Sequence, residues 1–354
     1  MRILIIQYQM LGDVLTSTII ADQLKIANPL ALVDYVITAP AVALVKGHPS
    51  IETIIPVKKQ DMETIGGIIS LSRKLTHENY DIIIDAYGKN SSALLCFLTR
   101  AKQKLGYKKW FAPLVYTKSV KNKPDFKIDF KGTSLWSRLI LTTLLDIKPD
   151  WNLQPAIYLS DKEHLNARKW LENAALNLNK PITMIGVLGS ENSKTLPAEI
   201  MAQLLDFTVK TTKTQVLFNY IPSQKEQALA IYDLCNEATK KHIFIDHYPS
   251  SIRDFLSVLS HCTTIIGNEG GAINMAKALN IPTFSIFSPW IVKEAWNAGE
   301  DDTKHIAVHL RDYEPALYAD RDYKNMKKNA AALYKKLTAV KMLPKLSLFL
   351  REHY

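Results

Sequence analysis

The sequence predicts an α/β protein with two doubly wound domains, and three observations support this prediction. Short apolar runs alternate with helical patterns, and these runs are apolar throughout, which is typical of parallel strands covered on both faces. The segment 148–155 carries two prolines and no periodicity, and the alternation restarts after it. At 354 residues, of which 47% are hydrophobic, the chain is long enough to form two cores. We therefore expect two Rossmann-like domains facing a central cleft.

The first half has the element order of a doubly wound sheet. Apolar runs predict strands at residues 2–7, 32–38, 53–57, 81–86 and 104–107. Helical periodicity predicts helices at residues 13–27, 40–47, 62–75, 90–99 and 134–145. Asn28-Pro29 closes the first of these helices, because proline cannot continue it. We expect the first domain to span residues 1–150.

The second half repeats the alternation. Apolar runs predict strands at residues 182–188, 214–219, 243–246, 263–267, 283–287 and 305–309. Helical patterns lie at residues 161–176, after Pro197, and at 222–235, 252–259 and 272–280. We expect a second domain over residues 151–315. The remaining tail, 316–354, has helical patterns at 323–340 and 344–351 and is long enough to cross back to the first domain.

The segment 263–279 reads as a buried strand, a glycine turn and the start of a helix. Gly267, Gly270 and Gly271 lack the Cβ atoms that would keep a ligand away from the backbone. The first amides of the helix are unpaired and carry the positive end of its dipole. The diphosphate of a sugar nucleotide would fit such a turn. The alternative is an ordinary strand-to-helix turn whose glycines serve packing alone.

The net charge of +10 is unevenly spread. One stretch is strongly basic, with Arg100, Lys102, Lys104, Lys108, Lys109, Lys118, Lys121, Lys123, Lys127 and Lys131. It is opposed only by Asp125 and Asp129 and is interleaved with aromatic residues. We expect a surface for an anionic membrane face, a phosphorylated glycolipid or nucleic acid, the alternative being a solvated lysine-rich loop. Nucleic acid ranks last, because no helix-turn-helix, zinc-finger or RNA-recognition signature is present.

Several classes of protein are disfavoured by the sequence. No apolar run approaches eighteen residues, so we expect neither a signal peptide nor a membrane span, and a cytoplasmic location. Cys96, Cys235 and Cys262 are odd in number and unpatterned, which argues against disulfides and against a zinc site. The absence of a Gly-x-Gly-x-x-Gly fingerprint argues against a nicotinamide cofactor.

The loop after the first predicted strand, residues 10–16, is the second candidate for a functional site. Gly12 would permit a sharp turn there. Asp13 would then stand in the first helical turn at the carboxyl end of the strand, facing the cleft. The alternative is that Asp13 only stabilises the helix through its dipole, by roughly 0.3–1 kcal/mol.

Four stretches resemble a known family when they are taken together. Leu11-Gly-Asp-Val-Leu15, with Thr18 following, resembles the N-terminal signature of glycosyltransferase family 9, the lipopolysaccharide heptosyltransferases. Gly47 to Val57 is similar to the passage from the family's second to its third strand. Leu188 to Pro197 is similar to its Lys-x-Trp-Pro element, with Leu196 in place of tryptophan. Gly267 to Leu279 resembles its Asp-Thr-Gly-Leu-x-His-Leu-Ala-x-Ala-Leu signature.

The resemblance implies a GT-B-type fold and an inverting, metal-independent glycosyl transfer without a cofactor. The donor would be a nucleotide sugar, with heptose from ADP-heptose as the family's case, and the acceptor an anionic lipopolysaccharide core at the inner membrane surface. Asp13 would be the general base, and Lys194 would pair with the donor diphosphate. Further donor contacts would come from Ser190, Glu226, Glu269, Gly270, Gly271 and Asn274. Acceptor contacts would come from Gly12, Arg100, Lys102, Lys108 and Lys109.

This chain departs from the family pattern at residues 269–274. Glu269, Gly270 and Asn274 replace the usual aspartate, threonine and histidine, so the phosphate site is expected to persist beside an altered sugar pocket. Three alternatives therefore stay open: a transferase for another nucleotide sugar, a sugar-nucleotide epimerase or hydrolase, and a non-catalytic glycan-binding relative.

Overall fold

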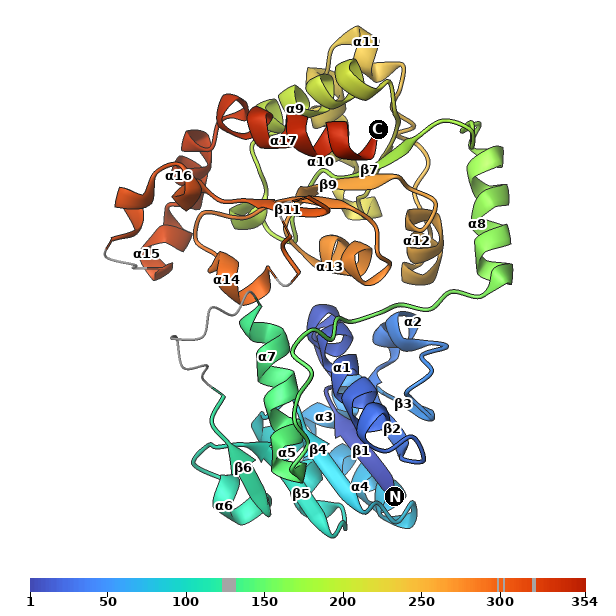
Figure 1. Cartoon of the computed structure of the whole chain (residues 1–354), viewed down its shortest axis with the longest axis vertical. Coiled ribbons are helices and arrows are strands. Elements are labelled where there is room, and N and C mark those ends of the chain that lie inside the picture. The colour runs from blue at the N-terminus through green and yellow to red at the C-terminus, as the bar shows by residue number, and fades with distance from the viewer. Residues whose placement is uncertain (123–131, 298, 302, 320–322) are drawn as a thin grey trace. The chain divides into compact units, whose positions relative to one another are not determined.

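The computed structural model describes residues 1–122, 132–297, 299–301, 303–319 and 323–354 of the chain. Contacts divide the chain into two compact units (Figure 1). Unit 1 comprises Met1–Tyr158 with Glu294–Ala298, and unit 2 comprises Leu159–Lys293 with Gly299–Tyr354. The chain therefore passes from one unit to the other just after the proline-bearing segment 148–155.

Unit 1 is built on a six-stranded parallel sheet. The strands are β1 (Arg2–Ile6), β2 (Leu32–Thr38), β3 (Thr53–Val57), β4 (Ile82–Asp85), β5 (Gln103–Tyr107) and β6 (Lys118–Val120). Their order in the sheet is β3-β2-β1-β4-β5-β6. The direction of winding thus reverses between β1 and β4, and in doubly wound sheets ligands bind beyond the carboxyl ends of the strands at this switch point.

Helices cover both faces of this sheet because its strands are apolar on both sides. The helices are α1 (Leu11–Ala27), α2 (Val42–Val45), α3 (Lys59–Glu63), α4 (Ile65–His77), α5 (Asn90–Leu98), α6 (Ala112–Val115) and α7 (Thr133–Leu139). Short 3-10 segments lie at Ala39–Ala41 and Ile140–Leu145. Leu4, Ile6 and Ile83 pack in one core with side chains of α3, α4 and α5, whereas Ile19 of α1 packs with Leu135 of α7.

Unit 2 is built on a five-stranded parallel sheet. The strands are β7 (Ile182–Gly186), β8 (Gln215–Phe218), β9 (Thr264–Asn268), β10 (Thr283–Ile286) and β11 (His305–Val308). Their order is β11-β10-β9-β7-β8, so the switch point lies between β7 and β9. The register of this pair brings Gly186 opposite Gly267.

The helices of unit 2 again follow the strands. They are α8 (Asp161–Asn173), α9 (Ala198–Thr212), α10 (Lys225–Leu234), α11 (Glu237–Lys240), α12 (Ile252–Leu259), α13 (Gly271–Ala278), α15 (Tyr323–Lys328), α16 (Ala330–Lys336) and α17 (Ala339–His353). The short helix α14 (Lys293–Trp296) belongs to unit 1 from Glu294 onward. A capping box opens α8, in which Ser160 accepts a hydrogen bond from the Glu163 amide and the Glu163 carboxylate accepts one from the Ser160 amide. Such a box satisfies two amides that the helix leaves unpaired.

The C-terminal tail belongs to unit 2. Leu346 and Phe349 of α17 are fully buried in the core of this unit, and α17 packs against α9. The Tyr354 hydroxyl lies 2.5 Å from the Thr183 hydroxyl and 2.7 Å from that of Thr264, which ties the end of the chain to β7 and β9. The predicted return of this tail to the first domain stays a prediction.

The predicted fold class is confirmed, and the differences from prediction are local. The strand expected at 243–246 is wrong, because Ile243 makes only an isolated bridge with Val216. The helix expected at 62–75 is broken, since the Thr64 side chain caps a new helix by accepting from the Gly67 amide.

Two further differences lie elsewhere in the chain. The sequence did not predict β6. The helix expected to begin at Pro344 begins five residues earlier, at Ala339, and carries Pro344 in its interior. Among the described residues, no helix is both long and apolar enough to span a membrane.

Candidate functional site

The turn between β1 and α1 places Asp13 at the carboxyl edge of the first sheet. The sharp turn is made by Met10, whose φ of 64° is unusual for a residue with a side chain. The prediction that Gly12 forms this turn is wrong, because α1 already begins at Leu11 and Gly12 lies inside it. Asp13 therefore stands in the first turn of α1, beside the switch point between β1 and β4.

Asp13 is held by an arginine that the sequence did not point to. Nη2 of Arg138 lies 2.9 Å from Oδ1 of Asp13, and the side chains are 10% and 23% exposed, respectively. No described residue donates a hydrogen bond to Oδ2 of Asp13. One carboxylate oxygen is thus fixed and the other is available to a ligand.

Arg138 is itself anchored in the wall of unit 1. Its Nη1 donates to the Ala86 carbonyl at 2.8 Å and to the Tyr107 hydroxyl at 3.3 Å. The Tyr107 hydroxyl donates in turn to the Ser137 carbonyl at 2.7 Å. One signal in the sequence could have found this residue, since Arg138 is the only charged residue of segment 134–145.

The loop after β4 lies next to Asp13 and is rigidly held. Asp85 is fully buried and accepts hydrogen bonds from the Gly88 amide at 2.8 Å and from the Ser92 and Tyr116 hydroxyls at 2.9 and 2.7 Å. Burial raises the pKa of Asp85, against the effect of these hydrogen bonds. Gly88 has a φ of 58°, and a Cβ there would lie 2.9 Å from the Tyr107 ring. The loop therefore needs glycine at this position.

The predicted basic residues are divided between the two edges of the first sheet. Lys108 and Lys109 follow β5 at the carboxyl edge, and Nζ of Lys109 donates to the Gly88 carbonyl at 2.6 Å. Arg100 and Lys102 precede β5 at the amino edge, where Lys102 pairs with Asp81 at 2.8 Å. The structure thus brings the first two lysines toward the Asp13 edge and leaves the other two cations at the opposite one. The basic residues Lys123, Lys127 and Lys131 lie outside the described residues.

In unit 2, Asn268 joins the ends of the two strands that flank the switch point. Its Nδ2 donates to the carbonyls of Gly186 and Val187, both at 3.0 Å, and its Oδ1 accepts from the Leu196 amide at 2.8 Å. Gly267 serves packing, because a Cβ there would lie 2.3 Å from the Gly186 carbonyl oxygen. The sequence did not mark Asn268, since a buried asparagine has no distinctive spacing.

The residues after Asn268 leave room for a ligand. A Cβ added at Gly270 would meet no heavy atom within 4 Å. No side chain caps α13, which begins at Gly271, so its first amides are free of side-chain acceptors. Among the described residues, the side chains of Glu269 and Asn274 have no hydrogen-bond or ion-pair partner. An anion and a polyhydroxy ligand could both bind at such a helix start.

Two charged groups at opposite ends of α13 have shifted pKa values: Glu269, which precedes the helix, and Lys277, in its last turn. Burial raises the pKa of Glu269, although the charges of Lys194 and Lys277 act to lower it. Burial lowers the pKa of Lys277 to about 8, against the attraction of Glu300 and Glu269. Such shifts on partly buried groups are frequent at functional sites.

Lys194 lies beside the indole ring of Trp290, and a second lysine, Lys327, lies beside the same ring. Nζ of Lys194 is 5.6 Å from the Trp290 ring centroid, and Nζ of Lys327 is 4.6 Å from the same centroid. Lys327 also pairs with Glu191 at 3.0 Å, while Trp290 Nε1 donates to the Ser193 carbonyl at 3.0 Å. The backbone of the loop that carries Lys194 is therefore hydrogen-bonded to Trp290, and the ammonium groups of Lys194 and Lys327 lie near the indole ring.

The remaining two predicted donor contacts, Ser190 and Glu226, are exposed. Ser190 lies in the loop after β7, and Glu226 lies in the first turn of α10, after β8. These two loops are neighbours, because Nε2 of Gln224 donates to the Gly189 carbonyl at 3.1 Å. All seven predicted donor residues thus follow strands of the second sheet at its carboxyl edge.

The described part of the chain contains no group of three or more His, Cys, Asp or Glu side chains that could hold a metal ion. Cys96, Cys235 and Cys262 are buried free thiols, and burial raises the pKa of each. The structure thus gives no metal ligand set within these residues and no thiol with the exposure of a nucleophile.

Comparisons with known proteins agree on one family. The family model described as glycosyltransferase family 9 (heptosyltransferase) matches residues 68–315. Lipopolysaccharide heptosyltransferase 1 of Campylobacter coli is 24% identical over 298 residues, which cover 81% of this chain and 84% of that protein.

Solved structures show the same fold. A family 9 glycosyl transferase from Veillonella parvula superposes with a TM-score of 0.83 at 17% identity, covering 99% of this chain and 97% of that one. The ADP-heptose lipopolysaccharide heptosyltransferase II of E. coli superposes with a TM-score of 0.66 at 18% identity, covering 95% and 99%. At these identities the likeness establishes the GT-B-type fold alone.

Proposed function

This chain belongs to glycosyltransferase family 9, the heptosyltransferases, and from that membership we propose that it transfers heptose from ADP-heptose to a lipopolysaccharide core acceptor. We propose further that the transfer is a single inverting displacement that needs no metal ion. The observation that carries this proposal is the Asp13–Arg138 pair, which leaves Oδ2 of a carboxylate at the carboxyl edge of the first sheet without a donor among the described residues.

Asp13 acts as the general base in this proposal. Its Oδ2 takes the proton from the acceptor hydroxyl while the hydroxyl oxygen forms a bond to the anomeric carbon of the donor. The bond from that carbon to the diphosphate oxygen breaks in the same step, and ADP leaves with the electron pair. Nη2 of Arg138 donates to Oδ1 at 2.9 Å, which orients the carboxylate.

The charge of the departing diphosphate is the main electrostatic demand of the reaction. Lys194 would meet it with its ammonium group, and the amides at Gly270 and Gly271 would meet it at the start of α13. The open space at Gly270 supports this assignment, because a phosphate can approach the backbone there. These donors would take the role that a divalent cation has in other nucleotide-sugar enzymes.

The sugar and nucleoside would be bound by the other predicted donor residues. Glu269 and Asn274 lack partners among the described residues, so their side chains are available for sugar hydroxyls. Ser190 and Glu226, on the neighbouring loops after β7 and β8, would contact the nucleotide.

The acceptor is proposed to bind on residues 1–150 and the donor on residues 151–315. Lys108 and Lys109 lie at the Asp13 edge and would meet phosphates or acidic sugars of the core acceptor, with Gly12 beside the base. Arg100 and Lys102, at the opposite edge, would be left to longer-range attraction of an anionic surface. We propose a cytoplasmic enzyme in peripheral contact with the inner membrane.

A nucleotide binding screen tests the donor site first. Because a ligand that binds only the folded state raises the melting temperature, saturating ADP is expected to raise Tm by several degrees more than UDP, GDP or CMP. The same shift should be lost in Lys194→Ala and kept in Lys210→Ala, a lysine on the last turn of α9. A larger shift with another nucleotide would favour a different sugar donor, and no shift at all would favour the non-catalytic relative.

Product analysis separates the remaining enzymatic alternative. A sugar-nucleotide epimerase or hydrolase would convert the donor without an acceptor, whereas the proposed transferase should consume ADP-heptose only when acceptor is present. Loss of transfer in both Asp13→Ala and Lys194→Ala, with folding retained, is expected.

A further inference from the structure

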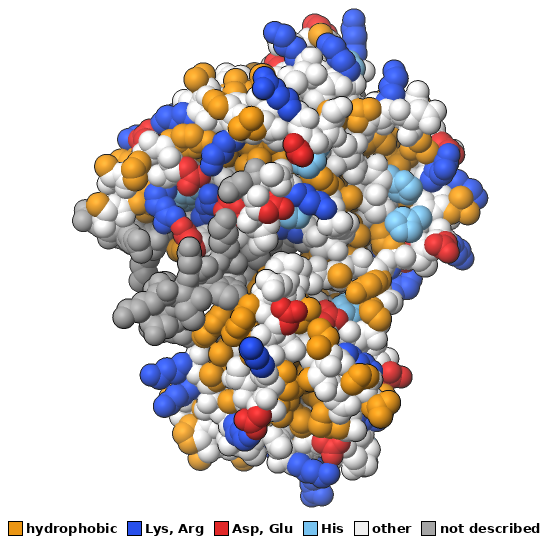
Figure 2. All heavy atoms as spheres, in the orientation of Figure 1, with side chains coloured by type: hydrophobic (Ala, Val, Ile, Leu, Met, Phe, Trp, Pro, Cys, Tyr) orange, Lys and Arg blue, Asp and Glu red, His pale blue; other side chains and the backbone are white. Residues whose placement is uncertain are grey.

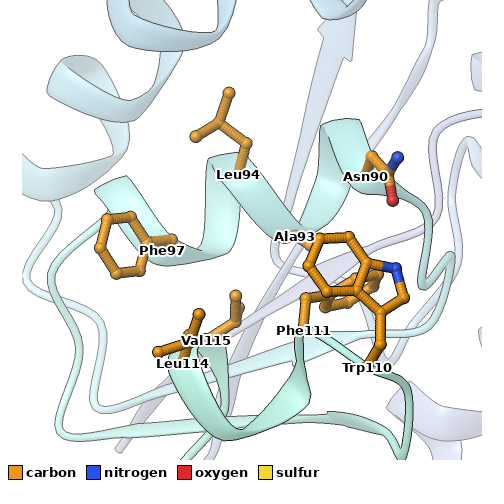
Figure 3. A pocket seen from close by; sticks show the side chains of 8 residues that line it. All are labelled: Asn90, Ala93, Leu94, Phe97, Trp110, Phe111, Leu114 and Val115. Carbon is orange, nitrogen blue, oxygen red and sulfur yellow. The ribbon is translucent and has the colours of Figure 1, made fainter.

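A pocket of about 360 Å³ opens between α5 and α6 of unit 1 (Figure 3). It is lined by Asn90, Ala93, Leu94, Phe97, Trp110, Phe111, Leu114 and Val115, of which only Asn90 is polar. Figure 3 shows Phe97 toward one end of α5, Trp110 toward the other, and Leu114 and Val115 between them. The proposed transfer reaction gives this pocket no role.

Large apolar side chains at the rim of the pocket are exposed to solvent. Trp110 is 82% exposed, Leu114 77% and Phe97 54%. The Trp110 ring packs edge-on against the ring of the buried Phe111, with 5.5 Å between the ring centroids. A contiguous exposed patch of this kind on a soluble protein marks an interaction surface.

The chain segment that forms the pocket is cationic. Residues 86–122 contain eight lysine or arginine side chains and no aspartate or glutamate. Nζ of Lys104 donates to the Phe97 carbonyl at 2.8 Å and lies 6.0 Å from the centroid of the Phe97 ring. In Figure 2, Lys and Arg side chains lie beside hydrophobic ones where Figure 1 places α6 and β6. The occupant should therefore be apolar in its body and anionic at its surface.

The pocket lies on the elements that also build the Asp13 edge. Asn90 begins α5 directly after the loop that follows β4, and Trp110 follows β5. Lys109 ties these two connections together through the Gly88 carbonyl at 2.6 Å. A surface that docks here therefore lies close to the carboxyl ends of β4 and β5, where a membrane-borne substrate would have to be presented.

We propose that this pocket and its basic rim are a membrane-docking site for an anionic phospholipid bilayer, with Trp110, Leu114 and Phe97 inserted among the acyl chains. Indole rings are favoured at the bilayer interface, and lysines near it gain from anionic headgroups. A polyanion such as nucleic acid would leave the apolar pocket unfilled. In a symmetric dimer formed through this surface, the eight cations of each copy would face those of the other copy and repel them.

This inference deepens the proposed function, on which it rests for the choice of a glycolipid-bearing membrane. The test is co-sedimentation of the full chain with vesicles of phosphatidylglycerol and phosphatidylethanolamine, compared with neutral phosphatidylcholine vesicles. Wild type should bind the anionic vesicles more tightly, and binding should weaken with added salt. The double variant Trp110→Ala/Leu114→Ala should lose about tenfold or more in partition coefficient, because apolar burial drives insertion.

A matched control is available on the same unit. Ile26 and Leu30 are 61% and 85% exposed and lie at the end of α1 and in the turn after it, and α1 packs in a different core from α5, so Ile26→Ala/Leu30→Ala should bind vesicles within about twofold of wild type. Brominated acyl chains should quench the fluorescence of wild type and quench Trp110→Phe much less. Unchanged melting temperatures would show that both double variants are folded, as expected for exposed side chains.

The proposal is overturned if wild type does not bind anionic vesicles, or if the Trp110→Ala/Leu114→Ala variant binds as wild type does. It is also overturned if that variant instead abolishes self-association or binding to a soluble polyanion while vesicle binding is absent. Transfer to a water-soluble, deacylated acceptor separates the two proposals. That activity should be unchanged in the pocket variant, and its absence in wild type would count against the proposed function alone.

Discussion

Nη2 of Arg138 lies 2.9 Å from Oδ1 of Asp13, although 125 residues separate the two in the sequence. This ion pair joins the first turn of α1 to α7 and fixes a carboxylate at the switch point of the first sheet. Because Oδ2 has no donor among the described residues, the pair presents one basic oxygen in a defined direction.

Asp13→Asn should reduce kcat for sugar transfer by roughly 10²–10⁴-fold, the usual contribution of a general base. The amide keeps the shape of the carboxylate and can still accept from Arg138, so nucleotide binding should be unchanged. Asp61→Asn, at an acid in the first turn of α3, is the matched control and should retain wild-type turnover. Near-normal transfer by Asp13→Asn would remove the aspartate from the mechanism.

Arg138→Met should lower kcat by about 10²-fold, because a misdirected base loses its alignment with the acceptor. Arg138→Lys should recover part of this loss, since it restores the charge but not the planar fork. The KM for the nucleotide sugar should stay the same in both variants. If Arg138 served folding alone, both variants would have a lower Tm but the same kcat. Steady-state kinetics measured well below Tm would distinguish the two roles.

Asn268→Ala should destabilise unit 2 by about 2–4 kcal/mol and lower Tm by roughly 5–15 °C. The substitution leaves the Leu196 amide and the Gly186 and Val187 carbonyls without their side-chain partner in a buried place. Asn192→Ala, at an exposed residue of the loop after β7, is the control and should melt like wild type. Equal melting of the two variants would mean that Asn268 does not hold the strand ends together.

Glu269→Gln should raise stability at neutral pH while it impairs transfer. Burial raises the pKa of Glu269 above its ordinary value of 4.5, so the unfolded chain releases this proton at lower pH than the folded chain does. The free energy of unfolding therefore falls as pH rises from about 4 through the folded pKa, and the loss persists above it. At pH 7.5 the variant should melt roughly 2–4 °C higher than wild type, and at about pH 4 the two proteins should have the same Tm.

The control for this prediction is Glu199→Gln, at an exposed acid in the first turn of α9, which should leave the pH profile of Tm unchanged. A Glu269→Gln profile parallel to that of wild type would show that burial of this carboxyl carries no cost.

The order of elements could be predicted from the sequence because buried parallel strands and their helices have distinct periodicities. The two sheets and nearly all of their strands follow from apolar runs alone. The strand expected at 243–246 is absent, since a short apolar run is equally compatible with an isolated β-bridge, which Ile243 forms with Val216. The start of the helix that carries Pro344 could not be predicted, because proline is common in the first turn of a helix and here lies in the interior of α17.

Site residues next to a strand end could be predicted, whereas their partners could not. Asp13 and Lys194 follow strands, and their position is visible in the sequence. Arg138 meets Asp13 only through the tertiary fold, and Asn268 becomes a link between strands only when β7 and β9 pair. The turn assigned to Gly12 belongs to Met10, because a positive φ was expected of glycine alone.

The most direct test of the central claim is the stereochemistry of transfer from ADP-heptose to a deacylated lipopolysaccharide core, followed by NMR of the new glycosidic linkage. Wild type is expected to form a product with inverted anomeric configuration, and Asp13→Asn is expected not to form it. A product with retained configuration, or equal transfer by both proteins, would contradict the central claim.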